Sequence, residues 1–134
     1  MNDVSDTSGG PLTLSVADAP DEIAPDGSLI FWLCRNSQAS TCICKLPPGY
    51  VSKPVRHGRV SELWYVISGA GELYRSGINH EQPVALQAGV AASIPVGHVF
   101  QFRAAKATEL TIHITTTPPW SGDDDATTQV TGLW

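Results

Sequence analysis

Short apolar segments, each closed by turn residues, recur along most of the chain. The turns are rich in Gly and Pro, as in residues 47–49 and 95–97, and the longest helix-like stretch is short. The pattern predicts nine strands, at residues 12–17, 29–34, 40–46, 60–68, 71–75, 83–86, 91–94, 98–103 and 108–117. Short strands at this close spacing are typical of a β-sandwich or a jelly roll and not of a parallel sheet with crossover helices. We therefore expect an all-β fold.

The composition fits one folded domain with polar ends. The chain has 134 residues, of which 42% are hydrophobic and 16% are charged, a mixture too apolar for a disordered polymer. We expect a flexible tail at residues 1–11, the β domain at 12–118 and an acidic C-terminal tail at 119–134. Because this tail ends in Trp134, we expect it to fold back onto the domain or onto a partner subunit.

Acidic residues gather at the two ends of the chain and basic residues in its middle. The formal net charge is −5, and all eight Lys and Arg lie between Arg35 and Lys106. They do not form the clustered stripe of a nucleic-acid-binding protein, and no apolar run approaches the roughly 18 residues of a membrane-spanning helix. We therefore expect neither nucleic acid nor a membrane as a partner. A mildly basic middle would tolerate an anionic ligand.

The three cysteines, Cys34, Cys42 and Cys44, indicate a reducing compartment. We expect no secretory leader, because the first 27 residues carry six acids and neither Lys nor Arg. An odd number of cysteines outside a secretory context favours free thiols in a cytoplasmic protein. We interpret Cys42 and Cys44 as small core side chains, the alternative being a thiolate metal pair.

Two windows, residues 49–69 and 89–103, combine turn glycines with polar residues at fixed spacing. Seven positions follow the two motifs of the cupin superfamily, namely Gly49, His57, Glu62 and Gly69 in the first and Gly89, Pro95 and Gly97 in the second. The sequence thus resembles the cupin superfamily over roughly residues 40–118. The resemblance implies a small single-domain jelly-roll barrel with a pocket inside it.

The chain departs from these motifs at the metal-binding positions. The resemblance implies three His and one Glu as ligands, but Val55 and Phe100 stand at two of the His positions and Ala104 replaces the usual Asn. Only His57 and Glu62 are left, and transition metals need at least three good protein ligands. We therefore expect no cofactor.

The alternative is a rebuilt metal site. His98 or His113 would join His57 and Glu62 to hold Fe, Mn, Ni or Zn, provided that its side chain points into the barrel. Otherwise both histidines are ordinary strand residues.

The spacing of His57 and Glu62 predicts how they meet. Residues five apart on one straight strand face opposite ways, so the two side chains converge only if the strand breaks between them, and Gly58 offers the place. If Glu62 points inward, then Trp64 and Val66 do so as well.

The same alternation turns Leu63, Tyr65 and Ile67 outward. An apolar stripe of this kind should not stay exposed on a monomer, which predicts a partner sheet and most simply a homodimer. The alternative is cover by the N-terminal or the C-terminal segment.

Apolar side chains around one imidazole and one carboxylate describe a ligand pocket. Its predicted wall consists of Val55, Trp64, Phe100 and Phe102, with His98 and His113 as further candidates. We expect the ligand to be a small organic molecule. In a proton-transfer enzyme of the isomerase, epimerase, lyase or cyclase type, His57 would be the base and Glu62 its partner. The alternatives are a non-catalytic metabolite-binding module and the metalloenzyme above.

Basic residues near the motifs offer a clamp for an anionic ligand. Arginine binds carboxylates and phosphates by paired hydrogen bonds. The candidates are Lys53, Arg56, Arg59, Arg75 and Arg103, and the alternative is a solvated rim.

Overall fold

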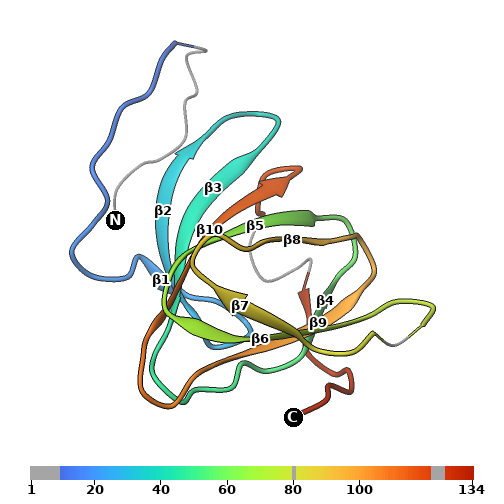
Figure 1. Cartoon of the computed structure of the whole chain (residues 1–134). Coiled ribbons are helices and arrows are strands. Elements are labelled where there is room, and N and C mark those ends of the chain that lie inside the picture. The colour runs from blue at the N-terminus through green and yellow to red at the C-terminus, as the bar shows by residue number, and fades with distance from the viewer. Residues whose placement is uncertain (1–9, 80, 122–125) are drawn as a thin grey trace.

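The computed structural model describes residues 10–79, 81–121 and 126–134, and in them the fold is all-β (Figure 1). These residues form the strands β1 (Glu22–Ile23), β2 (Leu29–Arg35), β3 (Ser40–Leu46), β4 (Val55–His57), β5 (Ser61–Ser68), β6 (Ala70–Ser76), β7 (Val84–Gln87), β8 (Ala91–Ile94), β9 (Val99–Ala104), β10 (Leu110–Thr117) and β11 (Ala126–Thr127). Eight of the nine predicted strands are confirmed, with ends that differ by at most two residues.

The strand predicted at residues 12–17 is wrong. These residues run as an extended segment without strand pairing, in which the Leu12 carbonyl accepts a hydrogen bond from Cys34 Sγ and Leu14 packs against the core. Alternating apolar residues tell which side chains face the protein, but not whether the backbone pairs. The prediction also missed β1, β4 and β11, because two or three residues are too few to show an alternation.

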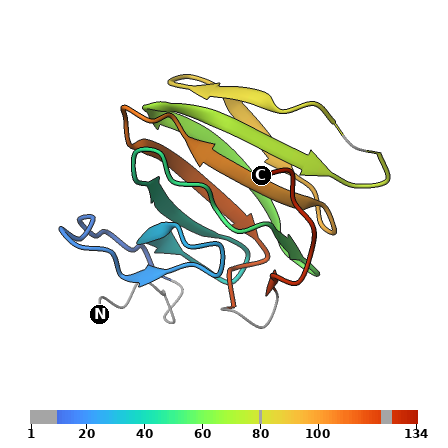
Figure 2. The same ribbon diagram turned by 90° about the horizontal axis from the view of Figure 1, so that it is seen from below.

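Two antiparallel sheets face each other (Figure 2). The first sheet has the strand order β1-β2-β3-β10-β5-β8, and the second has the order β11-β4-β9-β6-β7. The connection between β4 and β5 therefore passes from one sheet to the other. The flexible tail predicted at residues 1–11 falls almost entirely outside the described residues, and so does the acidic run at 123–125.

The motif glycines make the tight turns that this topology needs. Gly49, Gly69, Gly89 and Gly97 all adopt positive φ. At Gly69 a Cβ atom would also lie 2.0 Å from the Glu109 carbonyl oxygen, so the close approach of these two segments requires glycine.

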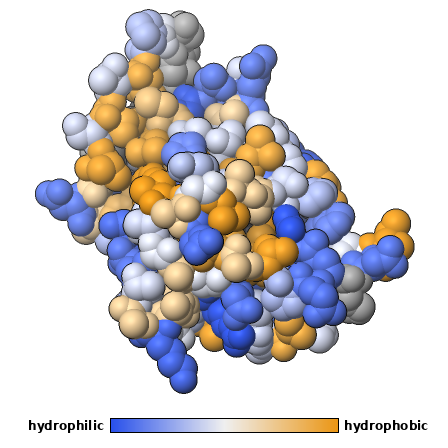
Figure 3. All heavy atoms as spheres, viewed as in Figure 1, coloured by the Kyte–Doolittle hydropathy of each residue, from blue (hydrophilic) through white to orange (hydrophobic). Residues whose placement is uncertain are grey.

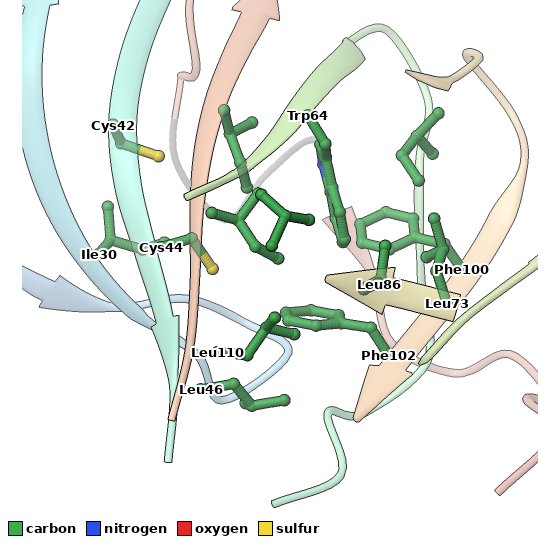
Figure 4. Packing of buried hydrophobic residues seen from close by; sticks show 14 of the residues in the cluster. Ile30, Cys42, Cys44, Leu46, Trp64, Leu73, Leu86, Phe100, Phe102 and Leu110 are labelled. Atoms are coloured by element: carbon green, nitrogen blue, oxygen red, sulfur yellow. The ribbon is translucent and has the colours of Figure 1, made fainter. Parts of the chain in front are cut away.

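The core fills the space between the sheets (Figure 4). Leu46, Cys44 and Leu110 from the first sheet meet Leu73 and Phe102 from the second, and all five are almost fully buried. Cys42 is buried as well, whereas Cys34 is exposed, and all three thiols are free. The interpretation of Cys42 and Cys44 as core side chains is confirmed.

The described part of the C-terminal segment folds back onto its own barrel. β11 pairs with β4, and Figure 2 shows the chain running on beside the second sheet to its end. There the buried Gln101 accepts hydrogen bonds from the Leu133 and Trp134 backbone N–H groups, each at 2.9 Å. The Arg103 guanidinium lies 4.2 Å from the centre of the Trp134 ring.

Strand β5 faces the way its alternation predicts. Trp64 and Val66 are buried, while Leu63, Tyr65 and Ile67 are 58%, 52% and 46% exposed. The described parts of both terminal segments leave this stripe open. On the face that Figure 3 shows, hydrophobic residues also gather where the N-terminal segment runs beside β2 and β3. None of the described residues belongs to a helix long and apolar enough to cross a membrane.

Candidate functional site

A cavity of about 50 Å³ lies inside the barrel. Most of its wall is hydrocarbon and aromatic, and it includes all four predicted wall residues, Val55, Trp64, Phe100 and Phe102. His57 and Glu62 line it too. A single water needs roughly 10–15 Å³ measured in this way, so the cavity has room for a few waters or a small chemical group.

His57 and Glu62 meet across the two sheets. His57 ends β4 in the second sheet and Glu62 follows the first residue of β5 in the first sheet, with the break between them that the spacing predicts. His57 Nε2 lies 3.0 Å from Glu62 Oε2, and both side chains are buried. The Trp64 indole Nε1–H donates to the other oxygen, Glu62 Oε1, at 2.7 Å. The carboxylate is therefore held in one orientation by two neighbours.

Aromatic rings enclose this pair. The His57 ring lies 5.7 Å from the Phe100 ring and 5.0 Å from the edge-on Trp120 ring, measured between centroids. Trp64 stacks edge-to-face with Phe100 at 5.9 Å and with Phe102 at 5.0 Å. Edge-to-face packing of this kind fixes the position of each ring.

The residues present do not fit the metal that the cupin motifs imply. Val55 and Phe100 are direct cross-strand partners on β4 and β9, so two hydrocarbon side chains lie side by side where two imidazoles would be needed. Both oxygens of Glu62 are already engaged by His57 and Trp64. In the described part of the chain, no group of three or more His, Cys, Asp or Glu is arranged to hold a metal ion.

The structure places His98 and His113 away from the cavity. His113 lies on the outward face of β10, between Ile43 and Tyr65 of the neighbouring strands. His98 precedes β9 and lines a separate polar hollow that Arg75 and Glu81 also line. The rebuilt metal site from His57, Glu62 and one of these histidines therefore does not assemble.

The basic residues near the motifs also lie elsewhere. Arg75 donates to Glu81 and Arg103 to Glu72, while Arg56 is exposed on β4. No Lys or Arg belongs to the described lining of the cavity. The anion clamp is thus absent from this part of the wall.

Sequence reasoning missed two carboxylates and two tryptophans of the wall. They are Glu22, Asp26, Trp32 and Trp120. Asp26 carries only the signal of a turn, because its Oδ1 accepts hydrogen bonds from the backbone N–H and the hydroxyl of Ser28. Trp120 follows Pro118-Pro119, and its backbone N–H donates to Ser40 Oγ at 2.9 Å, which brings the ring back over the barrel.

Burial has the largest effect on the pKa of Asp26, one of the two carboxylates that sequence reasoning missed. It raises the pKa of Asp26 above its ordinary value, the Ser28 hydrogen bonds oppose that rise, and the charge of Glu62 adds to it. Burial also raises the pKa of the Cys42 thiol, and the charges of Glu62, Asp26 and Glu22 raise it further. Glu22, Asp26 and Glu62 therefore all lie close enough to Cys42 to influence its pKa.

Comparisons with known proteins agree with this architecture. The chain resembles the crystal structure of BH2720 from Bacillus halodurans (17% identity, 90% of this chain and 92% of that chain, TM-score 0.67). It also resembles KdgF from a Halomonas species (21% identity, 75% and 86%, TM-score 0.63). A third similar structure is an uncharacterized conserved protein with a double-stranded β-helix domain from Klebsiella pneumoniae (18% identity, 75% and 82%, TM-score 0.61).

At these sequence identities the likeness shows the fold alone. No curated protein matches the sequence. The model of the cupin domain family matches residues 42–115, which is more than half of the chain and includes both motif windows. The chain therefore belongs to the cupin family.

Proposed function

We propose that this cupin binds a small organic molecule inside its barrel and that His57 and Glu62 transfer a proton on it. The observation that carries the proposal is the buried His57–Glu62 pair in the wall of an otherwise largely apolar cavity. Apolar walls with a few convergent polar groups are the usual make-up of a small-molecule site.

The geometry supports distinct roles for the two residues. Trp64 fixes the Glu62 carboxylate, and the carboxylate in turn orients the imidazole through Nε2. A base oriented by a third group is the arrangement that general acid–base catalysis requires. The surrounding rings exclude bulk water, which strengthens the electrostatic interaction between the pair and a bound molecule. The reaction classes that this supports are isomerisation, epimerisation, elimination and cyclisation.

A specific observation favours a second candidate, a module that binds its ligand without reaction. His57 and Glu62 satisfy each other, Trp64 takes the remaining carboxylate oxygen, and the cavity is small. In this case the pair would serve to shape the pocket.

Proton exchange with solvent separates the two candidates. Small organic molecules would first be screened for those that raise the melting temperature of the protein. Each ligand found would then be incubated with the protein in D2O and followed by NMR. Proton transfer predicts deuterium uptake into the ligand. Glu62→Gln and His57→Asn should slow that uptake by roughly 10²- to 10⁴-fold. The control is His113→Asn, which changes the same residue type on the outer face.

Three results decide between the two candidate functions. Uptake that is lost in the two pocket variants and kept in the control supports the enzyme. Binding without uptake or turnover supports the binding module. A screen in which no compound binds would reject the whole proposal.

We place the protein in the cytoplasm as part of this proposal. The free, exposed thiol of Cys34 supports a reducing compartment.

A further inference from the structure

We propose that the barrel cavity selects a small organic cation, an amine or quaternary ammonium group, held between its carboxylates and its aromatic walls. The inference rests on the proposed function, that the cavity binds a small organic molecule, and it names the chemical class. It replaces the anionic ligand that the charge pattern of the sequence would tolerate.

The charged groups of the described wall are almost all acidic. Glu22, Asp26 and Glu62 line the cavity, and no Lys or Arg joins them. His57 is the one described lining residue that gains a positive charge on protonation, and it lies against Glu62. Even with His57 charged, the charges of Glu22 and Asp26 are not balanced within the wall. An anion entering here would meet net repulsion.

Neutral groups supply the hydrogen bonds that the carboxylates receive. The Trp32 indole N–H donates to Glu22 Oε2 at 3.2 Å, and Ser28 donates twice to Asp26 Oδ1. These bonds orient the carboxylates and leave their charge in place. A buried carboxylate normally finds a cationic partner, and a bound organic cation would provide one.

The aromatic residues of the wall also favour a bound cation. The rings of Trp64, Phe100 and Trp120 line the cavity beside Glu62 and His57. The face of an aromatic ring attracts a cation, indole most strongly, and desolvation increases this attraction. Carboxylates and ring faces together distinguish an ammonium group from a neutral group of the same shape.

The residues of the wall differ in how deeply they are buried. Glu22, Asp26 and Trp120 are half-buried, whereas Glu62, Trp64 and Phe100 are buried. Glu62 lies among the buried rings, and a cation would come to lie near it, against Trp64 and Phe100. The volume of about 50 Å³ suits a compact headgroup.

Asp26 offers the sharpest variant for a test. Its carboxylate is unfavourable in the folded protein, because burial raises its pKa. Asp26→Asn keeps an oxygen for the Ser28 hydrogen bonds and removes the charge, so the variant should fold at least as well as the wild type. A residue with a purely structural role would not combine improved stability with weaker cation binding.

The experiment compares matched probes at constant ionic strength. The intact protein is titrated with propylammonium and with choline, then with their neutral counterparts, propanol and the analogue of choline in which carbon replaces nitrogen. Propanoate is the anionic probe. Tryptophan fluorescence reports binding, because Trp32, Trp64 and Trp120 line the cavity. We expect a cation to bind about tenfold or more tightly than its neutral counterpart.

The variants test where the selectivity arises. Asp26→Asn and Glu22→Gln should each weaken cation binding by about tenfold and weaken propanol binding clearly less. Glu109→Gln is the control, because it removes the same charge outside the barrel, where Glu109 faces Lys45.

The outcomes separate this inference from the proposed function. If propanol or propanoate binds as tightly as propylammonium, cation selection is refuted while small-molecule binding stands. If Glu109→Gln weakens cation binding as much as Asp26→Asn does, the effect comes from overall charge and the inference fails. If no probe binds, cation selection also fails, and the compound screen above then decides the proposed function by itself.

Discussion

His57 and Glu62 come from opposite sheets of the barrel, yet Nε2 of one lies 3.0 Å from Oε2 of the other. Only residues 58–61 separate them along the chain, so the short crossover from β4 to β5 joins the two sheets at the cavity. The pair therefore has a structural consequence whatever its chemistry. It ties the sheets together at the point where the wall carries its polar groups.

Removing the carboxylate should destabilise the protein strongly. Glu62→Ala leaves the Trp64 indole N–H and His57 without their acceptor in a buried place. We expect a loss of about 3 kcal/mol in the free energy of unfolding, measured by urea denaturation. Glu62→Gln keeps an acceptor and should lose clearly less.

The matched control is Glu72→Ala, which breaks the partly exposed ion pair with Arg103 and should cost less than about 1 kcal/mol. Equal effects of the two alanine variants would contradict the role assigned to Glu62.

The raised pKa of Asp26 predicts a pH-dependent gain in stability on its replacement. Because burial raises the folded-state pKa, the protonated form is favoured by folding, and that stability is lost as pH rises through the folded pKa. Asp26→Asn stays neutral, so at pH 7 its melting temperature should exceed that of the wild type. Below the unfolded value of about 3.9 the difference should vanish.

Asp18→Asn, at an exposed position, is the control and should leave the melting temperature nearly unchanged. A variant of Asp26 that is less stable than the wild type at pH 7 would show that its carboxylate contributes favourably to folding.

Restoring two nitrogen donors should restore metal binding. Val55 and Phe100 are cross-strand partners in the wall that also holds His57 and Glu62. Val55→His combined with Phe100→His supplies the imidazoles that the motifs lack, and we expect about one Zn²⁺ or Mn²⁺ per chain by elemental analysis.

The metal should also raise the melting temperature of this double variant but not that of Val55→Leu with Phe100→Leu. If the His variant takes up no more metal than the wild type, the absence of the two imidazoles is not what prevents metal binding.

The exposed stripe on β5 predicts a dimer. Leu63, Tyr65 and Ile67 lie outward, and the described terminal segments do not cover them. A second copy of the chain would bury them about a twofold axis. Light scattering should then give about twice the chain mass of 14.3 kDa for the wild type.

Tyr65→Glu should reduce the mass to that of one chain, whereas Ile78→Glu, at a fully exposed loop residue, should not. A wild-type protein that is monomeric across the tested concentrations would rule out this interface.

Local pattern was enough to locate most of the fold. The alternation of Glu62, Leu63, Trp64, Tyr65 and Val66 assigned each side chain to a face of β5, because successive residues of a strand point to opposite sides. Turn glycines marked the ends of strands, since positive φ at Gly69 and Gly89 disfavours other residues. The same reasoning required a break in the strand for His57 and Glu62 to converge, and the structure has that break between β4 and β5.

The sequence by itself thus determined the eight confirmed strands, because alternation depends on neighbours in the chain. Its resemblance to the cupin motifs implied the inward pair and the loss of two metal ligands. Tertiary structure alone decided that His98 and His113 face away from the cavity and that Asp26 and Trp120 line it. Asp26 belongs to an ordinary turn and Trp120 follows the last long strand, so neither carries a local signal of a site. They meet there because the two sheets close over one volume, and this closure depends on contacts between residues far apart in the sequence.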